Sequence, residues 1–100
     1  MSFYDDIYRL AAAIPLGKVA TYGQLAAMAG RPRASRIVGT AMLHAPKGLP
    51  CHRVIYRDGA LCCDQAFGGK AIQRQMLEAE GITFREDGRV DLEAHLWDGL

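Results

Sequence analysis

Apolar residues recur at helical spacing near the start of the chain, between a start signal and a stop signal. Ser2 followed by Asp5 is typical of a capping box, in which the two residues satisfy each other's backbone hydrogen bonds at a helix start. Pro15 ends the segment, because the residue before a proline avoids helical geometry. The pattern predicts a first helix between these signals. Its inward positions are Ile7, Leu10, Ala11 and Ile14.

Two further segments with helical spacing follow, joined by a short turn. Thr21 and Gln24 repeat the capping pattern, and Gly30 ends this second helix at the position where glycine is favoured. A third helix is predicted over 34–43. Two short helices joined by a glycine-containing turn are typical of a helix-turn-helix. The side chains expected to point inward from this pair are Leu25, Met28, Ile37, Val38 and Ala41.

After Pro46 the pattern changes to short apolar runs separated by turn residues. Such runs predict β-hairpins, the first with its turn at Asp58-Gly59. The predicted pairings are 54–56 with 60–62, and 82–84 with 89–90.

The last predicted elements are a helix over 70–80 and a short closing helix or coil over 92–97. Gly81 ends the first of these. The side chains expected to point inward are Ile72, Met76, Leu77, Leu96 and Trp97.

The fold class predicted from these elements is mainly α with small β hairpins, in a winged helix-turn-helix layout. The length of 100 residues indicates one domain over 1–100. No apolar run approaches the length of a membrane span, and the N-terminus lacks the pattern of a secretory signal. Three cysteines make a disulfide framework improbable and favour a reduced, cytoplasmic setting.

The net charge of +1 conceals a strong asymmetry along the chain. Residues 7–57 contain no acid and carry a charge of +8, whereas 58–100 hold nine acids against four bases, a charge of −5, and the first six residues add −2. A basic half in a near-neutral protein favours a polyanion-binding face. Ordinary surface charge divided by chance is the alternative interpretation.

A cysteine lies directly beside a histidine in the run Pro50-Cys51-His52-Arg53. Cysteine is a good nucleophile only as thiolate, and a nearby imidazole or cation favours that form. The proline stiffens the loop that presents the thiol. A small buried hydrophobe is the alternative interpretation of Cys51.

Six short elements, taken in order, resemble the C-terminal DNA-binding domain of the O6-alkylguanine-DNA alkyltransferases. They are Ile14-Pro15 with Gly17, Thr21-Tyr22-Gly23, Ala34-Ser35-Arg36 followed by Val38-Gly39, Pro50-Cys51-His52-Arg53-Val54, Gly68-Gly69, and Leu77 with Glu80-Gly81. The resemblance covers roughly residues 3–84, and the separate N-terminal domain of many family members is not part of it.

The resemblance implies that the third helix enters the minor groove of duplex DNA. Ala34, Ser35 and Gly39 belong to the DNA-contacting surface, where small side chains allow close approach. Arg36 resembles the arginine that fills the stack after the target guanine is flipped out. Tyr22 resembles the tyrosine that crowds the adjacent phosphate and donates a proton to the leaving guanine. Taken singly, Tyr22 is also typical of a half-buried helix-start aromatic, and Arg36 of a solvated charge.

The same resemblance implies a covalent mechanism. Cys51 attacks the alkyl carbon on O6, while His52, through a water, and Glu80 draw off the thiol proton. Taken singly, Glu80 is typical of a surface residue at a helix end. The active-site loop comprises Pro50, Arg53, Phe67, Gly68 and Gly69, with Arg53 bracing the loop. The product is an S-alkylcysteine, so each molecule acts once, and neither a cofactor nor a metal follows from this chemistry.

The chain departs from the family pattern at two pocket positions. Ala45-Pro46 stands where the family usually has an asparagine before proline, and Ala66 stands where a tyrosine usually lines the base pocket. Phe67 is a candidate to stack on a base instead. These departures put alkyl specificity and transfer rate in question more than DNA binding.

A second function class follows from the same resemblance. Alkyltransferase-like proteins are compact relatives that bind alkylated guanine without transfer and signal for nucleotide excision repair. They typically carry tryptophan at the cysteine position, whereas this chain keeps Cys51. The expected partners are therefore double-stranded DNA containing O6-alkylguanine and nucleotide excision repair proteins, bound by a monomer with no membrane association. A zinc set of Cys51, His52, Cys62 and Cys63 is a third interpretation, with spacing unlike a zinc knuckle or ribbon.

Overall fold

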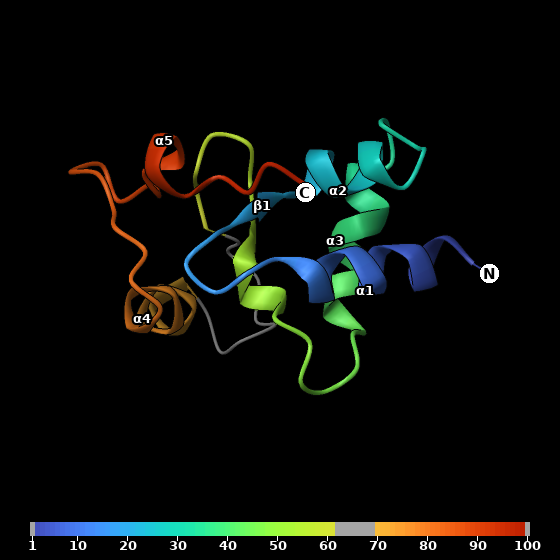
Figure 1. The fold of residues 1–100 in the computed structure, drawn as a ribbon, viewed down its shortest axis with the longest axis horizontal. Coiled ribbons are helices and arrows are strands. Elements are labelled where there is room, and N and C mark those ends of the chain that lie inside the picture. The colour runs from blue at the N-terminus through green and yellow to red at the C-terminus, as the bar shows by residue number, and fades with distance from the viewer. Residues whose placement is uncertain (1, 62–69, 100) are drawn as a thin grey trace.

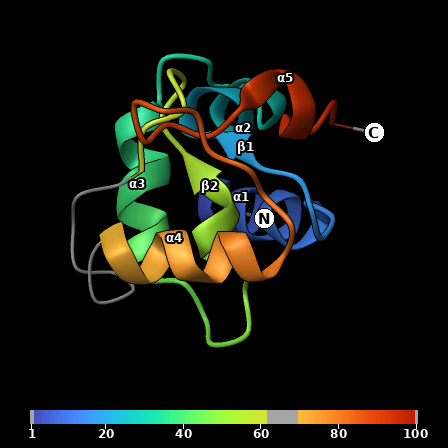
Figure 2. The ribbon, with the colours of Figure 1, turned by 90° about the vertical axis from the view of Figure 1, so that its left-hand side faces the viewer.

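A short parallel sheet lies between a three-helix group and a fourth helix (Figures 1 and 2). The computed structural model describes residues 2–61 and 70–99. The elements in chain order are α1 Phe3–Ala13, β1 Ala20–Thr21, α2 Tyr22–Met28, α3 Ser35–Leu43, a 3₁₀ turn η1 Cys51–Arg53, β2 Val54–Ile55, α4 Lys70–Ala79 and α5 Leu92–His95.

The predicted helix starts are confirmed by their capping hydrogen bonds. The Ser2 hydroxyl accepts from the Asp5 N–H at 3.1 Å, and the Thr21 hydroxyl accepts from the Gln24 N–H at 3.0 Å. In both cases the third residue's side chain accepts from the capping residue's own N–H, which completes the capping box. Gly30 ends α2 as predicted, with φ of 88°. These signals fix where α1 and α2 begin and where the turn to α3 is.

The predicted hairpin of 54–56 with 60–62 is wrong in its strand partner. β2 pairs in parallel with β1, with Ala20 opposite Val54 and Thr21 opposite Ile55. The predicted turn is present, since the Tyr56 N–H donates to the Ala60 carbonyl at 3.0 Å. The true partner strand lies more than thirty residues earlier in the chain, beyond the reach of a local pattern. The second predicted pairing is confirmed only as a single antiparallel bridge, between Phe84 and Val90.

The sheet divides the interior into two apolar cores, because successive strand residues point to opposite faces. Ala20 and Val54 face a core made with α1, α2 and α3, which also contains Cys51 and Trp97. Val19 and Ile55 face a smaller core, which they form with Leu61, Leu77, Ile82 and Val90. The chain after Arg53 is thereby held between both cores.

Several side chains predicted to point inward are exposed instead. Leu25, Val38, Ala41, Leu77 and Trp97 are buried as predicted. The inward orientation is wrong for five side chains, each about two-fifths exposed: Met28, Ile37, Ile72, Met76 and Leu96. In α4 the buried position is taken by Gln73, which is fully buried one position from Ile72. Apolar identity alone therefore assigned the wrong face to part of the helix.

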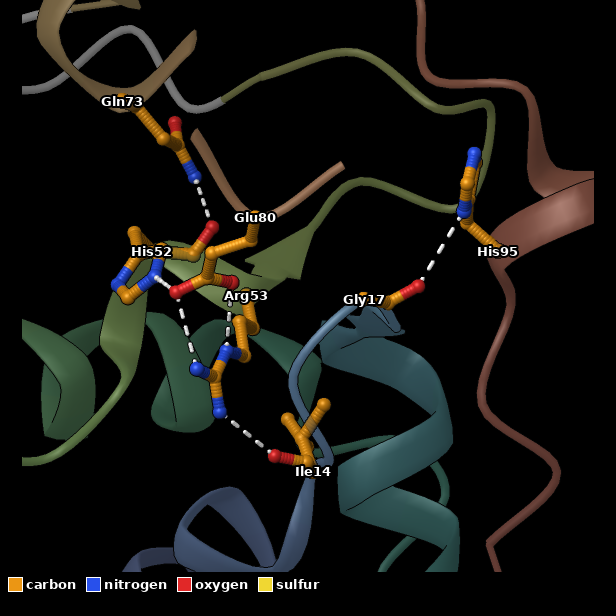
Figure 3. A network of polar contacts seen from close by, with 7 residues as sticks. All are labelled: Ile14, Gly17, His52, Arg53, Gln73, Glu80 and His95. Carbon is orange, nitrogen blue, oxygen red and sulfur yellow. Dashed lines mark hydrogen bonds and ion pairs between the residues drawn. The ribbon is translucent and has the colours of Figure 1, made fainter. Parts of the chain in front are cut away.

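The C-terminal segment is tied to the start of the sheet by polar contacts. The His95 ring contacts the Gly17 carbonyl through Nδ1 at 3.2 Å (Figure 3). Its Nε2 accepts from the Thr83 N–H at 3.0 Å. The backbone N–H of Trp97 donates to the Val19 carbonyl at 2.7 Å. The closing segment thus completes both cores.

The predicted fold class is confirmed in its main features. The chain is mainly α, α2 and α3 form the helix-turn-helix, and residues of the turn at 56–60 line a groove together with residues of α3. The correction concerns the β component, which is a parallel pair. No helix in the described part of the chain is long and apolar enough to cross a membrane.

Two glycines in turns provide a matched test of how tightly the 56–60 turn is packed. Gly59 and Gly88 have φ of 89° and 86°, a backbone conformation that costs a residue with a side chain about 1–2 kcal/mol. A Cβ at Gly59 would lie 2.9 Å from the Val90 carbonyl oxygen, whereas one at Gly88 meets no heavy atom within 4 Å. We expect Gly88→Ala to lower the free energy of unfolding by about 1 kcal/mol and Gly59→Ala by about 3 kcal/mol, measured by urea denaturation. Equal losses would contradict this packing.

Candidate functional site

The 3₁₀ turn η1 presents Cys51 and His52 and is anchored from α4. The Cys51 N–H donates to the Leu49 carbonyl at 2.8 Å, and the Arg53 N–H donates to the Pro50 carbonyl at 3.1 Å. Gln73 donates through Nε2 to the His52 carbonyl at 3.0 Å, inside the protein. A buried amide that satisfies the backbone of the turn explains why α4 buries a polar residue.

One carboxylate joins the turn to the end of α4 (Figure 3). His52 Nε2 lies 2.7 Å from Glu80 Oε2. The Arg53 guanidinium forks onto the same carboxylate, with Nε 2.8 Å from Oε1 and Nη2 2.9 Å from Oε2. Arg53 Nη1 also donates to the Ile14 carbonyl at 2.8 Å, at the end of α1. The geometry predicted for Glu80 and Arg53 is therefore present, although their roles in function stay predictions.

The end of α4 positions Glu80 through a Schellman motif. The Ile82 N–H donates to the Leu77 carbonyl at 3.1 Å, and the Gly81 N–H donates to the Glu78 carbonyl at 3.0 Å. Gly81 has φ of 87°, as this motif requires, and the side chains of Ile82 and Leu77 share the smaller core. Glu80 is the last residue before this reversal, and its carboxylate reaches the side chains of His52 and Arg53 on η1.

The charges of this cluster determine which imidazole nitrogen carries the proton. The hydrogen bond from Arg53 lowers the pKa of Glu80, with a further contribution from His52, while burial opposes the shift. The carboxylate is therefore ionised at neutral pH and can only accept hydrogen bonds. Nε2 of His52 must then be the donor, and in the neutral form of the ring Nδ1 is the acceptor.

The Cys51 thiol is buried and is 8% exposed. Burial raises the pKa of Cys51, partly opposed by a hydrogen bond from its own backbone N–H. Among the described residues, no hydrogen bond links the thiol directly to the His52 ring. At neutral pH the sulfur is thus protonated, and its proton is not hydrogen-bonded to the His52 ring.

A groove of about 870 Å³ opens between α3 and the turn at 56–60. Tyr22, Ser35, Arg36 and Gly39 line it, as do residues of the turn. A further cavity of about 420 Å³ beside Arg74 and Arg89 contains none of the predicted site residues. The groove therefore gathers the residues that the sequence assigned to DNA contact.

The α3 wall of the groove is open to close approach by a ligand. Gly39 lies inside α3, where glycine costs about 1 kcal/mol relative to alanine. A Cβ at Gly39 would meet no heavy atom within 4 Å, so packing within the protein does not require the missing side chain. Arg36 is exposed on this wall, and in the described part of the chain no acid pairs with its guanidinium.

The predicted site residues fall into two groups. Cys51, His52, Arg53 and Glu80 form the polar cluster, with Pro50 immediately before η1. Tyr22, Ser35, Arg36 and Gly39 form the groove, whereas Ala34 is buried at the start of α3. The predictions for Phe67, Gly68 and Gly69, and for Ala66, lie outside the described residues.

Two residues of the site were not predicted. Gln73 anchors η1, and its position four residues before buried Leu77 is the signal that places it on the inner face of α4. Tyr56 lines the groove, and its position directly after an apolar strand is the corresponding signal.

The described residues contain no group of three or more His, Cys, Asp or Glu side chains arranged to hold a metal ion. Cys62 and Cys63 of the zinc interpretation lie outside those residues. That interpretation therefore stays untested.

Comparisons with known proteins match nearly the whole chain. The family described as 6-O-methylguanine DNA methyltransferase, DNA binding domain, matches residues 2–82. A DNA base-flipping protein of Escherichia coli K12 is 41% identical, over 97% of this chain and 75% of that protein. A methylated-DNA–protein-cysteine methyltransferase of Cricetulus griseus is 39% identical, over 86% of this chain but only 42% of that protein. The crystal structure of Schizosaccharomyces pombe Atl1 in complex with damaged DNA containing O6-carboxymethylguanine superimposes with a TM-score of 0.83 at 34% identity, covering 96% of this chain and 94% of that one. The fold is therefore winged-helix-like.

The shared carboxylate predicts a specific pH dependence of stability. Glu80→Gln leaves Arg53 beside a neutral amide in a mostly buried site, so we expect a loss of about 3 kcal/mol in the free energy of unfolding at pH 7. The depressed pKa of Glu80 gives a stabilisation that is complete above the ordinary glutamate pKa of about 4.3 and is lost as the pH falls through the lower folded value. The difference between wild type and variant in the free energy of unfolding, measured by urea denaturation, should therefore narrow as the pH falls below about 4.3. Parallel pH profiles of wild type and Glu80→Gln would contradict the ionised carboxylate.

The exposed pair of Arg74 with Glu78 provides the control, because Glu78→Gln should lower the free energy of unfolding by less than about 0.5 kcal/mol.

Proposed function

The chain belongs to the 6-O-methylguanine DNA methyltransferase family, and we propose that it binds duplex DNA containing O6-alkylguanine, flips the damaged base out and transfers the alkyl group to Cys51. One observation carries the proposal: Cys51 and His52 share η1, with Glu80 placed against His52 at 2.7 Å. A thiol, a base and a group that orients the base are the parts that a covalent transfer needs.

The DNA-binding step is supported by the groove and by the charge of the chain. Residues 7–57 carry a charge of +8 and include all of α2 and α3. The small residues Ser35 and Gly39 allow α3 to approach the sugars of the minor groove closely. Arg36 would fill the stack left by the flipped base, which partly offsets an unstacking cost of a few kcal/mol.

The proposed transfer forms one bond and breaks one bond. The thiol proton passes through a water to Nδ1 of His52, whose Nε2–H stays on Glu80. The sulfur then forms a bond to the alkyl carbon, and the bond from that carbon to O6 breaks with its electron pair remaining on guanine. The Tyr22 hydroxyl donates a proton to the leaving base. The S-alkylcysteine has no route back to the thiol, so each molecule acts once.

Lesion binding without transfer is a second candidate, favoured by the environment of the thiol. Cys51 is 8% exposed, burial raises its pKa, and no side chain of another described residue hydrogen-bonds to its sulfur. In this version the protein marks the lesion for other repair proteins, with nucleotide excision repair as the proposed pathway and a monomer as the binding unit. Both candidates use the same groove and differ only in the fate of the alkyl group.

A mass measurement separates these two candidates. We expect incubation with a duplex containing one O6-methylguanine to add one methyl mass to the protein, located on Cys51 by peptide mass spectrometry. Cys51→Ser should bind the lesion duplex without a mass gain, because a hydroxyl is a far weaker nucleophile than a thiolate. Lesion binding by wild type with an unchanged mass would favour the non-transferring candidate. A methyl group on Cys62 or Cys63 would contradict the assignment of the acceptor.

Arg36 and Arg33 are a matched pair for testing base flipping. Both are exposed and lie near the start of α3, but only Arg36 lines the groove. We expect Arg36→Ala to lower affinity for the lesion duplex about tenfold beyond any loss on unmodified duplex. Arg33→Ala should lower both affinities alike, by about two- to threefold, as loss of a phosphate contact does. Equal effects of Arg36→Ala on both duplexes, measured by fluorescence anisotropy at fixed salt, would reduce Arg36 to a phosphate contact.

A further inference from the structure

The register of the sheet brings two tyrosines to the same edge. Thr21 pairs with Ile55 at the carboxyl ends of the two parallel strands. Tyr22 and Tyr56 follow these residues directly, so they emerge side by side from the sheet. Their rings are in contact, with centroids 5.4 Å apart and planes tilted by 51°. Both side chains line the groove opposite α3.

The two rings differ in how much a ligand can reach. Tyr22 is 8% exposed, whereas Tyr56 is 42% exposed. Tyr56 therefore forms the accessible surface of the aromatic pair, and Tyr22 supports it from behind. A partly exposed aromatic ring in a groove offers a face on which a nucleic-acid base can stack.

The backbone that carries Tyr56 is held in place on several sides. The Tyr56 N–H donates to the Ala60 carbonyl at 3.0 Å, and its carbonyl accepts from the Gly59 N–H at 2.9 Å. The Val90 N–H donates to the Gly59 carbonyl at 2.9 Å, which ties the turn to the C-terminal half. A ring on a braced turn loses little conformational entropy on binding.

The acid beside the ring is already engaged within the protein. Asp58 Oδ1 accepts from the Ala60 N–H at 3.0 Å, and Oδ2 lies 3.7 Å from Arg89 Nη2. Its charge is thus partly compensated, while Arg36 and Arg57 line the same groove. The groove combines an aromatic surface with cationic flanks, which is the pattern that binds an unstacked base and its phosphates.

We propose that Tyr56 is a specificity-determining residue, whose ring stacks on the purine of the flipped O6-alkylguanine. The proposal rests on the proposed function, because it requires a base outside the duplex. Stacking on the ring face is insensitive to the substituent on O6, so Tyr56 contributes equally to recognition of small and bulky alkyl groups.

The test compares affinities for a lesion duplex and an otherwise identical unmodified duplex. Tyr56→Leu keeps apolar bulk against Tyr22 but removes the aromatic face, and we expect it to lower lesion affinity about tenfold. Affinity for the unmodified duplex should change less than about twofold. Tyr56→Phe keeps the ring and should restore most of the lesion affinity. Arg57→Gln, on the adjacent residue, should weaken both duplexes equally and serves as the matched control.

Each outcome has a distinct meaning. Retention of the lesion preference by Tyr56→Leu would overturn the stacking role, as would equal losses in Tyr56→Phe and Tyr56→Leu. A loss on both duplexes would make Tyr56 a general contact or a part of the fold, and thermal unfolding monitored by circular dichroism distinguishes these two. Repeating the series with O6-methylguanine and O6-benzylguanine should give the same fold-change. A wild-type protein with no lesion preference would instead refute the proposed function, and the stacking role with it.

Discussion

The carboxylate of Glu80 is the point on which the arrangement of the site depends. It binds His52 and Arg53 of η1 from the end of α4, and Arg53 extends the connection to the Ile14 carbonyl at the end of α1. The Glu80 carboxylate and the Arg53 guanidinium thus join three segments that are distant in sequence. Because Arg53 occupies both oxygens, the carboxylate stays ionised and its direction is fixed. His52 therefore has one allowed tautomer, and the orientation of its ring follows from an interaction on the far side of the turn.

Such a network suits a domain whose sheet is very small. Each strand has two residues, so backbone pairing alone does little to set the position of η1. Gln73 adds a buried hydrogen bond to the His52 carbonyl, and it does so from the same helix that ends at Glu80. α4 consequently acts on the turn twice, once through an amide and once through a carboxylate. The two apolar cores stabilise the chain, whereas these polar contacts determine where the thiol and the imidazole lie.

Local signals in the sequence predicted the helices well, and long-range contacts account for what it missed. The capping boxes at Ser2 and Thr21 depend on residues three positions apart, so they are visible in the sequence and are confirmed. The partner strand of β2 is not visible in the local sequence, because the parallel pairing joins segments more than thirty residues apart. Gln73 was missed for a related reason: a glutamine is buried only where distant backbone atoms accept its hydrogens. The groove followed from motif residues on α2 and α3, but Tyr56 became part of it only through the register of the sheet.

The two candidate functions differ in whether the Cys51 thiol loses its proton. In the free protein Cys51 is protonated and nearly enclosed, a state that protects a thiol from oxidation and from reaction with small electrophiles. In our proposal, transfer uses a water between the thiol and Nδ1 of His52 and an alkyl carbon beside the sulfur, both of which would arrive with the DNA. The oriented imidazole is already in place for that step, since Glu80 holds Nε2 at 2.7 Å. The intact cluster of Cys51, His52 and Glu80 supports our proposal of transfer, while the contacts of Glu80 with η1 would serve a protein that only binds lesions equally well.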